Sequence, residues 1–326
     1  MERSNIVATT RVRLARNLKG YPFPHMIKDE KTYDEIIDRV SDCLAAGTDM
    51  TTRRIRDMKP IERQRLIERH VISPELSRLT RGALISTPDE SISVMVNEED
   101  HIRIQAVCPG LDINRALMAA GEVEDMLSET LMLAYDDEFG YLTACPTNVG
   151  TGMRISAMVH LPALTRGGAI GELSGSLSRI GYTLRGVYGE GSEQLGDMYQ
   201  ISNEVTLGST KAEIAADFKK VIDKVCDSEM TARKEISRQM GAQLEDEVMR
   251  SLGQLKYCRS ISSAQAIEML SNIALGVSLG WIRVDLGEIY AAFWEIMPAC
   301  LAAENESTVR RDMKRAKYLN ELLKEV

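Results

Sequence analysis

The sequence predicts an α+β fold, in which a strand-rich part is followed by an all-helical part. Up to about residue 208, short apolar runs are separated by polar, glycine-containing turns, a pattern typical of strands and their connections. From about residue 209, strand signals become rare and helical periodicity continues nearly to the end of the chain. A chain of 326 residues is long enough for two domains, which we predict at 1–230 and 231–326.

The composition argues against several classes of protein. A net charge of -8 argues against a nucleic-acid-binding protein, because such proteins need a basic face. The 6 cysteines contain no CxxC pair, which favours reduced thiols in a cytosol over disulfides or a zinc site. Residues 1–5 lack an apolar signal segment, and no apolar run approaches the roughly 20 residues of a membrane span. We therefore predict a cytoplasmic protein with neither nucleic acid nor membrane as a partner.

Local patterns predict the elements of the first part. Arg11 and Arg13 alternate with apolar residues over 7–19, so a strand there places both guanidinium groups on one face. Helical patterns predict helices over 31–46 and over 60–79, the second entered at Pro60 and containing His70. The other elements predicted in this part are strands at 91–96, 101–107, 141–144, 155–161, 182–188 and 198–207, and a helix at 114–135.

The second part is predicted to consist of helices at 210–236, 239–256, 262–278, 286–302 and 307–325. Those between 239 and 302 are apolar on one face. This pattern fits either the core of a helical bundle or a dimer interface, and the sequence alone favours neither.

One glycine-containing turn carries a thiol at one end and a guanidinium at the other. Cys145 follows a short apolar run, Gly150 and Gly152 would let the backbone approach a ligand, and Arg154 begins another apolar run. This arrangement predicts an anion site with a reactive cysteine beside it. A buried cysteine on an ordinary hairpin turn explains the same residues.

Arginine and glutamate recur at turns and strand ends of the first part. The residues are Arg11, Arg13, Glu98, Glu99, Arg103, Arg154, Arg185 and Glu190. Several guanidinium groups together can hold a polyphosphate through bidentate hydrogen bonds. Each arginine taken alone is typical of a solvated surface, but their joint occurrence in an acidic chain favours a shared anion site.

Four stretches of the sequence resemble the signature blocks of the phosphagen kinases, the family of creatine kinase and arginine kinase. They occur in the family's order, at 10–17, 97–103, 139–151 and 185–190. Four blocks in order are a specific signal, although one alone is not. The resemblance implies that residues 1–230 form a phosphagen-kinase-like catalytic domain, with a glutamine-synthetase-like antiparallel sheet flanked by helices.

Within this family, the chain most resembles the bacterial protein-arginine kinases of the McsB type. The first block lies almost at the start of the chain, whereas phosphagen kinases for small substrates carry a further N-terminal segment. Residues 185–203 resemble the bacterial version of the last block. Residues 311–316 match the RDxxRA motif with which this branch binds phosphoarginine. The resemblance thus implies an all-α C-terminal domain that carries this site and provides a homodimer interface.

The resemblance also implies which residues hold ATP. They are Thr9, Thr10, Arg11, Val12, Arg13, His70, Arg103, Arg154, Ile155, Ser156, Ala157, Met158, Arg185, Gly186, Val187, Tyr188, Gly189 and Glu190. Arginine suits the phosphates because its guanidinium is planar and permanently charged. Mg²⁺ is expected on phosphate oxygens and water, without a metal site formed by protein side chains.

The acceptor guanidinium must be oriented and must lose a proton, since its pKa lies above about 12. By resemblance, Glu99 and Glu190 grip its nitrogens, Glu99 acts as the general base, and Cys145 orients the group as a thiolate. Two interpretations of Glu98 remain open: it orders the waters of the metal, or it is an acidic turn residue in solvent.

The RDxxRA motif implies an allosteric phosphoarginine site formed by Arg311, Asp312, Arg315 and Ala316. On a helix, Arg311 and Arg315 share one face and could chelate the phosphate, while Asp312 pairs with the guanidinium. Without the resemblance, the same residues are typical of an exposed helix with ion pairs.

The function implied by the resemblance is ATP-dependent phosphorylation of arginine side chains in proteins. In that branch the activity belongs to the stress response: it inactivates a heat-shock repressor and tags proteins for Clp proteases, with an activator protein as a partner. Two alternatives are a kinase for a small free guanidino compound and a non-catalytic phosphoarginine-binding adaptor. The missing N-terminal segment argues against the first, and the intact Glu99, Cys145 and Glu190 argue against the second.

Overall fold

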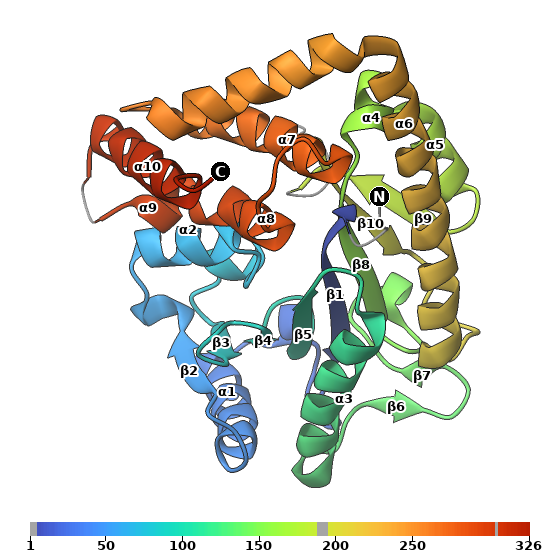
Figure 1. The fold of residues 1–326 in the computed structure, drawn as a ribbon. Helices are drawn as coiled ribbons and strands as arrows, with labels where there is room; N and C mark the ends of the chain where they lie inside the picture. Colours follow the sequence, from blue (N-terminus) through green and yellow to red (C-terminus); the bar gives the residue numbers. More distant parts are fainter. Residues whose placement is uncertain (1–4, 188–194, 304–305) are drawn as a thin grey trace.

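The computed structural model describes residues 5–187, 195–303 and 306–326, and its centre is one antiparallel sheet (Figure 1). Within these ranges the sheet has 8 strands, and all neighbouring strands are antiparallel. In spatial order they are β2 (Thr51–Arg54), β3 (Ala83–Ser86), β4 (Ile92–Val96), β5 (Ile102–Pro109), β1 (Val7–Arg16), β8 (Met153–His160), β10 (Met198–Asn203) and β9 (Tyr182–Arg185).

The central strand β1 shows why the two faces of the sheet differ. Its residues alternate, so that Val12 and Leu14 are fully buried on one face while Arg11 and Arg13 lie on the other. The predicted strand and its shared arginine face are therefore confirmed.

Three long helices of the described residues cover most of the apolar face of the sheet. They are α1 (Glu30–Ala45), α3 (Ile113–Thr130) and the first half of α6 (Lys211–Tyr257), and their apolar residues form one core with the strands. Figure 1 shows α1 and α3 side by side beneath the sheet and α6 along its edge. Asp29 and Asp112 cap α1 and α3 by accepting hydrogen bonds from backbone N–H groups in the first turn.

The helical region, residues 241–326, has a second core that reaches into the sheet. It contains the second half of α6 together with α7 (Ser263–Leu279), α8 (Leu286–Glu295), α9 (Pro298–Leu301) and α10 (Thr308–Leu322). Ala8, Met158, Val187 and Met198 from the strand part are buried in the same core. The helical region is therefore packed directly against the sheet.

Smaller elements connect these layers. They are α2 (Pro60–Glu68), α4 (Pro162–Arg166), α5 (Ile170–Ser178), the hairpin β6 (Tyr135–Asp136) and β7 (Gly140–Tyr141), and the 3₁₀ turns η2 (Pro24–Met26), η3 (Ile55–Asp57), η4 (Leu76–Arg78) and η5 (Pro146–Asn148).

The predicted α+β class is confirmed, but several predicted elements are wrong. The helix predicted over 60–79 ends at Glu68, and the predicted strand 141–144 is reduced to Tyr141 at the end of β7. The helix predicted over 286–302 is broken before Pro298, because a proline disfavours helical backbone at the residue that precedes it. Strands β2 and β3, with 4 residues each, were not predicted.

The two helices predicted at 210–236 and 239–256 are one helix of 47 residues, α6. Residues 237–241 contain no proline, and a lone glycine costs a helix only about 1 kcal/mol. α6 passes without a break through residue 230, where we placed the domain boundary, and that boundary remains a prediction.

Among the described helices, none combines the length and the apolar character that crossing a bilayer requires.

Candidate active site

Five arginines from four strands lie on the face of the sheet opposite α1 and α3. Arg13 of β1 stands directly across from Arg154 of β8, and Arg11 lies two residues along the same strand. Arg103 comes from β5 on the other side of β1, and Arg185 ends β9. All five line one cavity of about 430 Å³, which we call the arginine cavity. The predicted cluster is thus brought together by strand register.

The positive charges in this cavity repel one another. The pKa of Arg11 is lowered from 12.5 to about 10, first by burial and then by the charges of Arg103 and Arg154. Burial and the neighbouring guanidinium groups also hold the pKa of Arg13 well below 12.5. Within the described residues, the buried Nε atoms of Arg13 and Arg103 have no hydrogen-bond partner. A polyanion would relieve the repulsion and satisfy these donors.

Neutral side chains fix the guanidinium groups in place. Arg11 donates from Nε to Ser156 Oγ at 3.2 Å and from Nη2 to Gln200 Oε1 at 2.6 Å. Arg154 donates from Nη2 to Ser202 Oγ at 3.0 Å. Because these partners carry no charge, they orient the arginines without cancelling the attraction for an anion.

Glu98 is the exception, because its carboxylate forms an ion pair inside the site. It lies 2.8 Å from Nη2 of Arg103, accepts a hydrogen bond from the hydroxyl of Ser73 and is 6% exposed. The interpretation of Glu98 as a turn residue in solvent is therefore wrong.

Glu99, one residue further along the same turn, is exposed and meets Cys145. Its carboxylate lies beside the Cys145 side chain, which favours the charged form of the carboxylate. Displacement of water by the surrounding protein raises the pKa of Glu99, and the negative charge of Asp100 raises it further, while Arg103 opposes both effects. The structure thus brings two of the three predicted catalytic residues into contact.

A buried carboxylate holds the Glu99 turn against the Cys145 segment. Oδ1 of Asp100 accepts hydrogen bonds from the backbone N–H of Ala144 at 2.7 Å and from Nδ2 of Asn17 at 2.6 Å. Asn17 in turn accepts from the backbone N–H of His101 at 2.9 Å. Three separate segments of the chain are therefore joined behind the catalytic pair.

The turn after Cys145 does not use its glycines as predicted. A Cβ atom on Gly152, at φ +57°, would lie 2.5 Å from Arg16 Nη1, and one on Gly150, at φ +107°, would lie 2.4 Å from Thr206 O. These glycines let the backbone approach other parts of the protein, not a ligand. Cys145 itself is half-buried, with its Sγ 3.0 Å from the Thr147 hydroxyl.

Strand alternation divides the other predicted nucleotide residues. Thr9, Ser156 and Met158 line a cavity of about 120 Å³ beside the arginines, which we call the middle cavity. The side chains that alternate with them point into the opposite face and line neither cavity: Thr10, Val12, Ile155 and Ala157. The prediction included every residue of these strand segments as nucleotide-binding, although only alternate side chains of a strand can reach the site.

The segment after Arg185 is only partly described. Val187 lines the arginine cavity and is also buried in the core of the helical region, with Gly186 before it. The predicted Tyr188, Gly189 and Glu190 lie outside the described residues.

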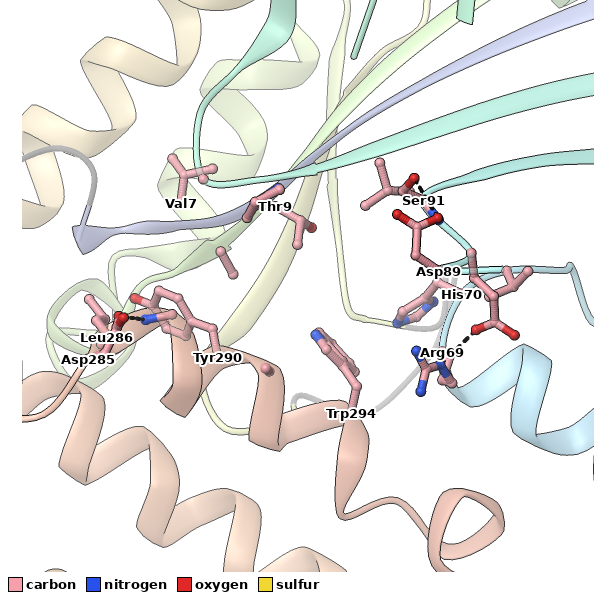
Figure 2. A pocket seen from close by; sticks show the side chains of 18 of the residues that line it. Val7, Thr9, Arg69, His70, Asp89, Ser91, Asp285, Leu286, Tyr290 and Trp294 are labelled. Carbon is pink, nitrogen blue, oxygen red and sulfur yellow. Dashed lines mark hydrogen bonds and ion pairs between the residues drawn. The ribbon is translucent and has the colours of Figure 1, made fainter. Parts of the chain in front are cut away.

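His70 lies after the end of α2, with φ +58°, and not within a helix as predicted. Its ring lines the arginine cavity, the middle cavity and a third, outer cavity of about 480 Å³. Burial lowers the pKa of His70 from 6.5 to about 3, with a smaller contribution from the charge of Arg11. Figure 2 shows the outer cavity, with His70 facing Trp294 of α8 across it.

Sequence reasoning missed three residues of this site. Gln200 accepts a hydrogen bond from Arg11, and Ser202 accepts one from Arg154. The two residues are two apart on the predicted strand 198–207, and this alternation could have placed both on the face of the arginines. Trp294 comes from the helical region, and nothing in the local sequence connects it to the arginines.

The RDxxRA segment lies on α10 and is only partly exposed. Arg315 is 1% exposed and donates from Nε to Ile296 O and from Nη1 to Ile261 O and Asp312 Oδ1, while Ala316 is buried beside it. Arg311 is half-buried and donates to the Thr308 hydroxyl. Arg315 and Asp312 are thus already paired with each other, and the predicted phosphoarginine site remains a proposal.

Two family models match the chain in order. The first, described as the C-terminal catalytic domain of ATP:guanido phosphotransferases, matches residues 32–232. The chain belongs to the ATP:guanido phosphotransferase family. The second model, described as the McsB C-terminal domain of protein-arginine kinase, matches residues 241–326 of this phosphotransferase.

Curated relatives match this ATP:guanido phosphotransferase over nearly their whole length. A protein-arginine kinase from Caldanaerobacter subterraneus is 40% identical over 324 residues, which cover 97% of this chain and 96% of the relative. A protein-arginine kinase from Halothermothrix orenii is 41% identical over 322 residues, which cover 97% of this chain and 92% of the relative.

Solved structures of guanidino kinases share the fold of this phosphotransferase. The duplicated taurocyamine kinase from Schistosoma mansoni, with bound transition state analog components, has a TM-score of 0.63 and 26% identity, covering 69% of this chain and 33% of that one. A lombricine kinase structure has a TM-score of 0.60 and 23% identity, and the match covers 73% of this chain and 68% of that chain. The second likeness concerns the fold alone.

Proposed function

We propose that this chain is a protein-arginine kinase, which transfers a phosphoryl group from ATP to an arginine side chain of another protein. The observation that supports this proposal best is that two groups of residues lie next to each other. Arg11, Arg13, Arg103, Arg154 and Arg185 line one cavity, and the Glu99–Cys145 pair lies at the turn that precedes Arg103.

The first step is to bind the triphosphate in the arginine cavity. Phosphoryl transfer depends mainly on positioning and on charge stabilisation of the transferred group. The guanidinium groups held by Ser156, Gln200 and Ser202 are oriented in advance, so they need not reorganise during transfer.

Mg²⁺ fits this proposal as a partner of the phosphate oxygens. The carboxylate of Glu98, beside Arg103 of the arginine cavity, would order water molecules of the ion, while the phosphate oxygens would bind it directly. When bound, the ion would neutralise charge on the phosphates.

The second group of residues prepares the acceptor. The Glu99 carboxylate takes a proton from the substrate guanidinium as the N–P bond forms, and its raised pKa makes it a better base than a free glutamate. The Cys145 side chain lies beside Glu99 and orients the substrate guanidinium. We assign Glu190 as the second carboxylate on the family resemblance alone.

The remaining assignments also rest on family resemblance. They are the cytoplasm as the location, a homodimer, an activator protein, delivery of phosphorylated proteins to Clp proteases, and allosteric phosphoarginine binding at Arg311–Ala316. Copurification of Clp subunits and of an activator, gel filtration, and phosphoarginine titration of Arg311→Ala each test one of these assignments.

The activity is tested by incubating the protein with Mg-ATP and either free arginine or an unfolded arginine-rich protein. Acid-labile N–P phosphate on the protein alone supports the proposal. Label on free arginine alone would indicate a kinase for a small guanidino compound, and phosphoarginine binding without label would indicate an adaptor. Glu99→Gln, which keeps the shape of the side chain and removes the base, is the matched inactive control.

A further inference from the structure

The arginine cavity continues into a longer cleft. It shares Arg11, His70 and Gln200 with the middle cavity. The middle cavity shares His70 and Trp294, among others, with the outer cavity. The three cavities therefore adjoin in a row from the arginines of the sheet to helix α8, and we call this row the cleft.

Trp294 projects from α8 into this cleft, pointing toward His70 (Figure 2). The two rings meet edge to face, with centroids 4.9 Å apart and an interplanar angle of 82°. The indole is only half-buried, and it lines both the middle and the outer cavity, so part of it remains open to a ligand.

Helix α8 holds the indole firmly against the sheet. Ile289 and Phe293 of the same helix are buried in the core of the helical region. The hydroxyl of Tyr290 donates to the backbone carbonyl of Asn5, just before β1, at 2.7 Å. The position of Trp294 relative to the arginines is thus set by packing on both sides of the cleft.

The chemistry of the cleft changes along its length. The arginine cavity is cationic and suits phosphates, whereas the middle cavity has Val107, Met158 and Trp294 in its wall. A nucleotide whose phosphates occupy the arginines must extend its ribose and base along the cleft. Aromatic and apolar surfaces favour a flat nucleobase, which stacks on such side chains.

We propose that the base of the bound nucleotide lies against Trp294, so that the helical region forms one wall of the nucleotide site. This inference rests on the proposed function insofar as ATP is the phosphoryl donor. It assigns to α8 a ligand contact that belongs to neither the arginine cluster nor the acceptor residues.

The emission of Trp294 gives a direct test. The chain has 2 tryptophans, so Trp281→Phe leaves Trp294 as the only one. We expect ADP to change the emission of this variant in a saturable way. Inorganic tripolyphosphate, which fills the arginine cavity without a base, should leave the emission nearly unchanged. The reciprocal variant Trp294→Phe, which retains Trp281 outside the cleft, should not respond to ADP.

Affinity gives an independent test. Loss of a base–aromatic stack should raise the Kd for ADP about ten-fold in Trp294→Ala. The Kd for tripolyphosphate should be unchanged, and Trp294→Phe should retain most of the affinity. Trp281→Ala, which removes an indole from the same helical region but not from the cleft, is the matched control. If Trp294→Ala does not fold, the response of the Trp281→Phe emission to ADP still tests the proposal.

The outcomes separate this inference from the proposed function. A response of Trp294 to ADP supports the inference even if no arginine becomes phosphorylated. An active kinase in which ADP binds without changing the Trp294 emission, or in which Trp294→Ala binds ADP like the parent, would overturn it.

Discussion

At the scale of single residues, we propose that the site separates binding of the donor from preparation of the acceptor. Arg154 lies in the arginine cavity and donates to Ser202, whereas Cys145 lies beside Glu99 of the neighbouring turn. The two residues are the ends of one glycine-containing turn, and substitutions at each end should have different kinetic effects.

We expect Arg154→Ala to raise the KM for ATP by roughly ten-fold or more, because a charge-assisted hydrogen bond contributes about 1.5–3 kcal/mol. Cys145→Ala should lower kcat and leave the KM for ATP within about two-fold, since the thiol contacts the acceptor side of the site. Steady-state kinetics with an unfolded protein substrate measures both. Ser202→Ala, which removes one of the partners that orient Arg154, should have a smaller effect than Arg154→Ala. Equal changes in the KM for ATP in the two main variants would contradict this division.

The pH dependence of the reaction should report the ionisation of Glu99. A general base works when ionised, so activity falls as the pH drops through its pKa, which here lies above the usual 4.5. The charge of Asp100 contributes to that increase, so Asp100→Asn should move the acid limb of kcat/KM to lower pH. Asparagine can still accept the hydrogen bonds of Ala144 and Asn17. An acid limb that does not move in a folded variant would argue against Glu99 as the base.

The residues of the site differ in how far the sequence reveals them. The arginines and Glu99 lie in recognisable blocks, and alternation on strands places Arg11 and Arg13 on one face. The same alternation, applied fully, would have excluded Val12 and Ile155. Asp100 and Trp294 depend on contacts between distant segments, which no local pattern contains.

At the scale of elements, long periodic segments were predicted well and their ends less well. β1, α1 and α3 follow strong alternation or apolar stripes, so tertiary packing agrees with the local pattern. The end of α2 depends on a left-handed residue, His70, that the pattern did not reveal. The edge strand β2 and its neighbour β3, with 4 residues each, are too short to show a period.

Two glycines in helices should respond in opposite ways to the same substitution. Gly241 lies inside α6, and a Cβ atom there would meet nothing within 4 Å, so Gly241→Ala should raise the free energy of unfolding by about 0.5–1 kcal/mol. Gly276 lies inside α7, where a Cβ atom would come within 2.4 Å of Val248 Cγ1 on α6. Gly276→Ala should therefore destabilise the protein by about 1–3 kcal/mol. Urea denaturation measures both, and stabilisation by Gly276→Ala would show that α6 and α7 pack less closely than described.

At the scale of the whole molecule, the strand part and the helical region are joined by more than a linker. Ala8, Met158, Val187 and Met198 belong to the core of the helical region, and α6 contributes to both cores. Arg233 of α6, buried beside Glu229, also donates to the backbone carbonyl of His160 at the end of β8.

This shared core predicts a single cooperative unfolding transition. Both tryptophans, Trp281 and Trp294, lie in the helical region, so their fluorescence reports on that region selectively. Far-UV circular dichroism reports on the whole chain. We expect the two signals to change at the same temperature. If the midpoint of the fluorescence change lay several degrees below the midpoint of the circular dichroism change, the helical region would unfold separately.

The crowded positive charge of the arginine cavity also affects how the protein should be handled. We expect sulfate or phosphate in a buffer to enter the same cavity as nucleotide, because each relieves the repulsion that, together with the larger effect of burial, lowers the pKa of Arg11 and Arg13. Apparent affinities for ATP will then vary with the buffer anion as well as with ionic strength. Uncharged or zwitterionic buffers with chloride are therefore the proper reference condition, and crystals grown from sulfate should contain that anion among the five guanidinium groups.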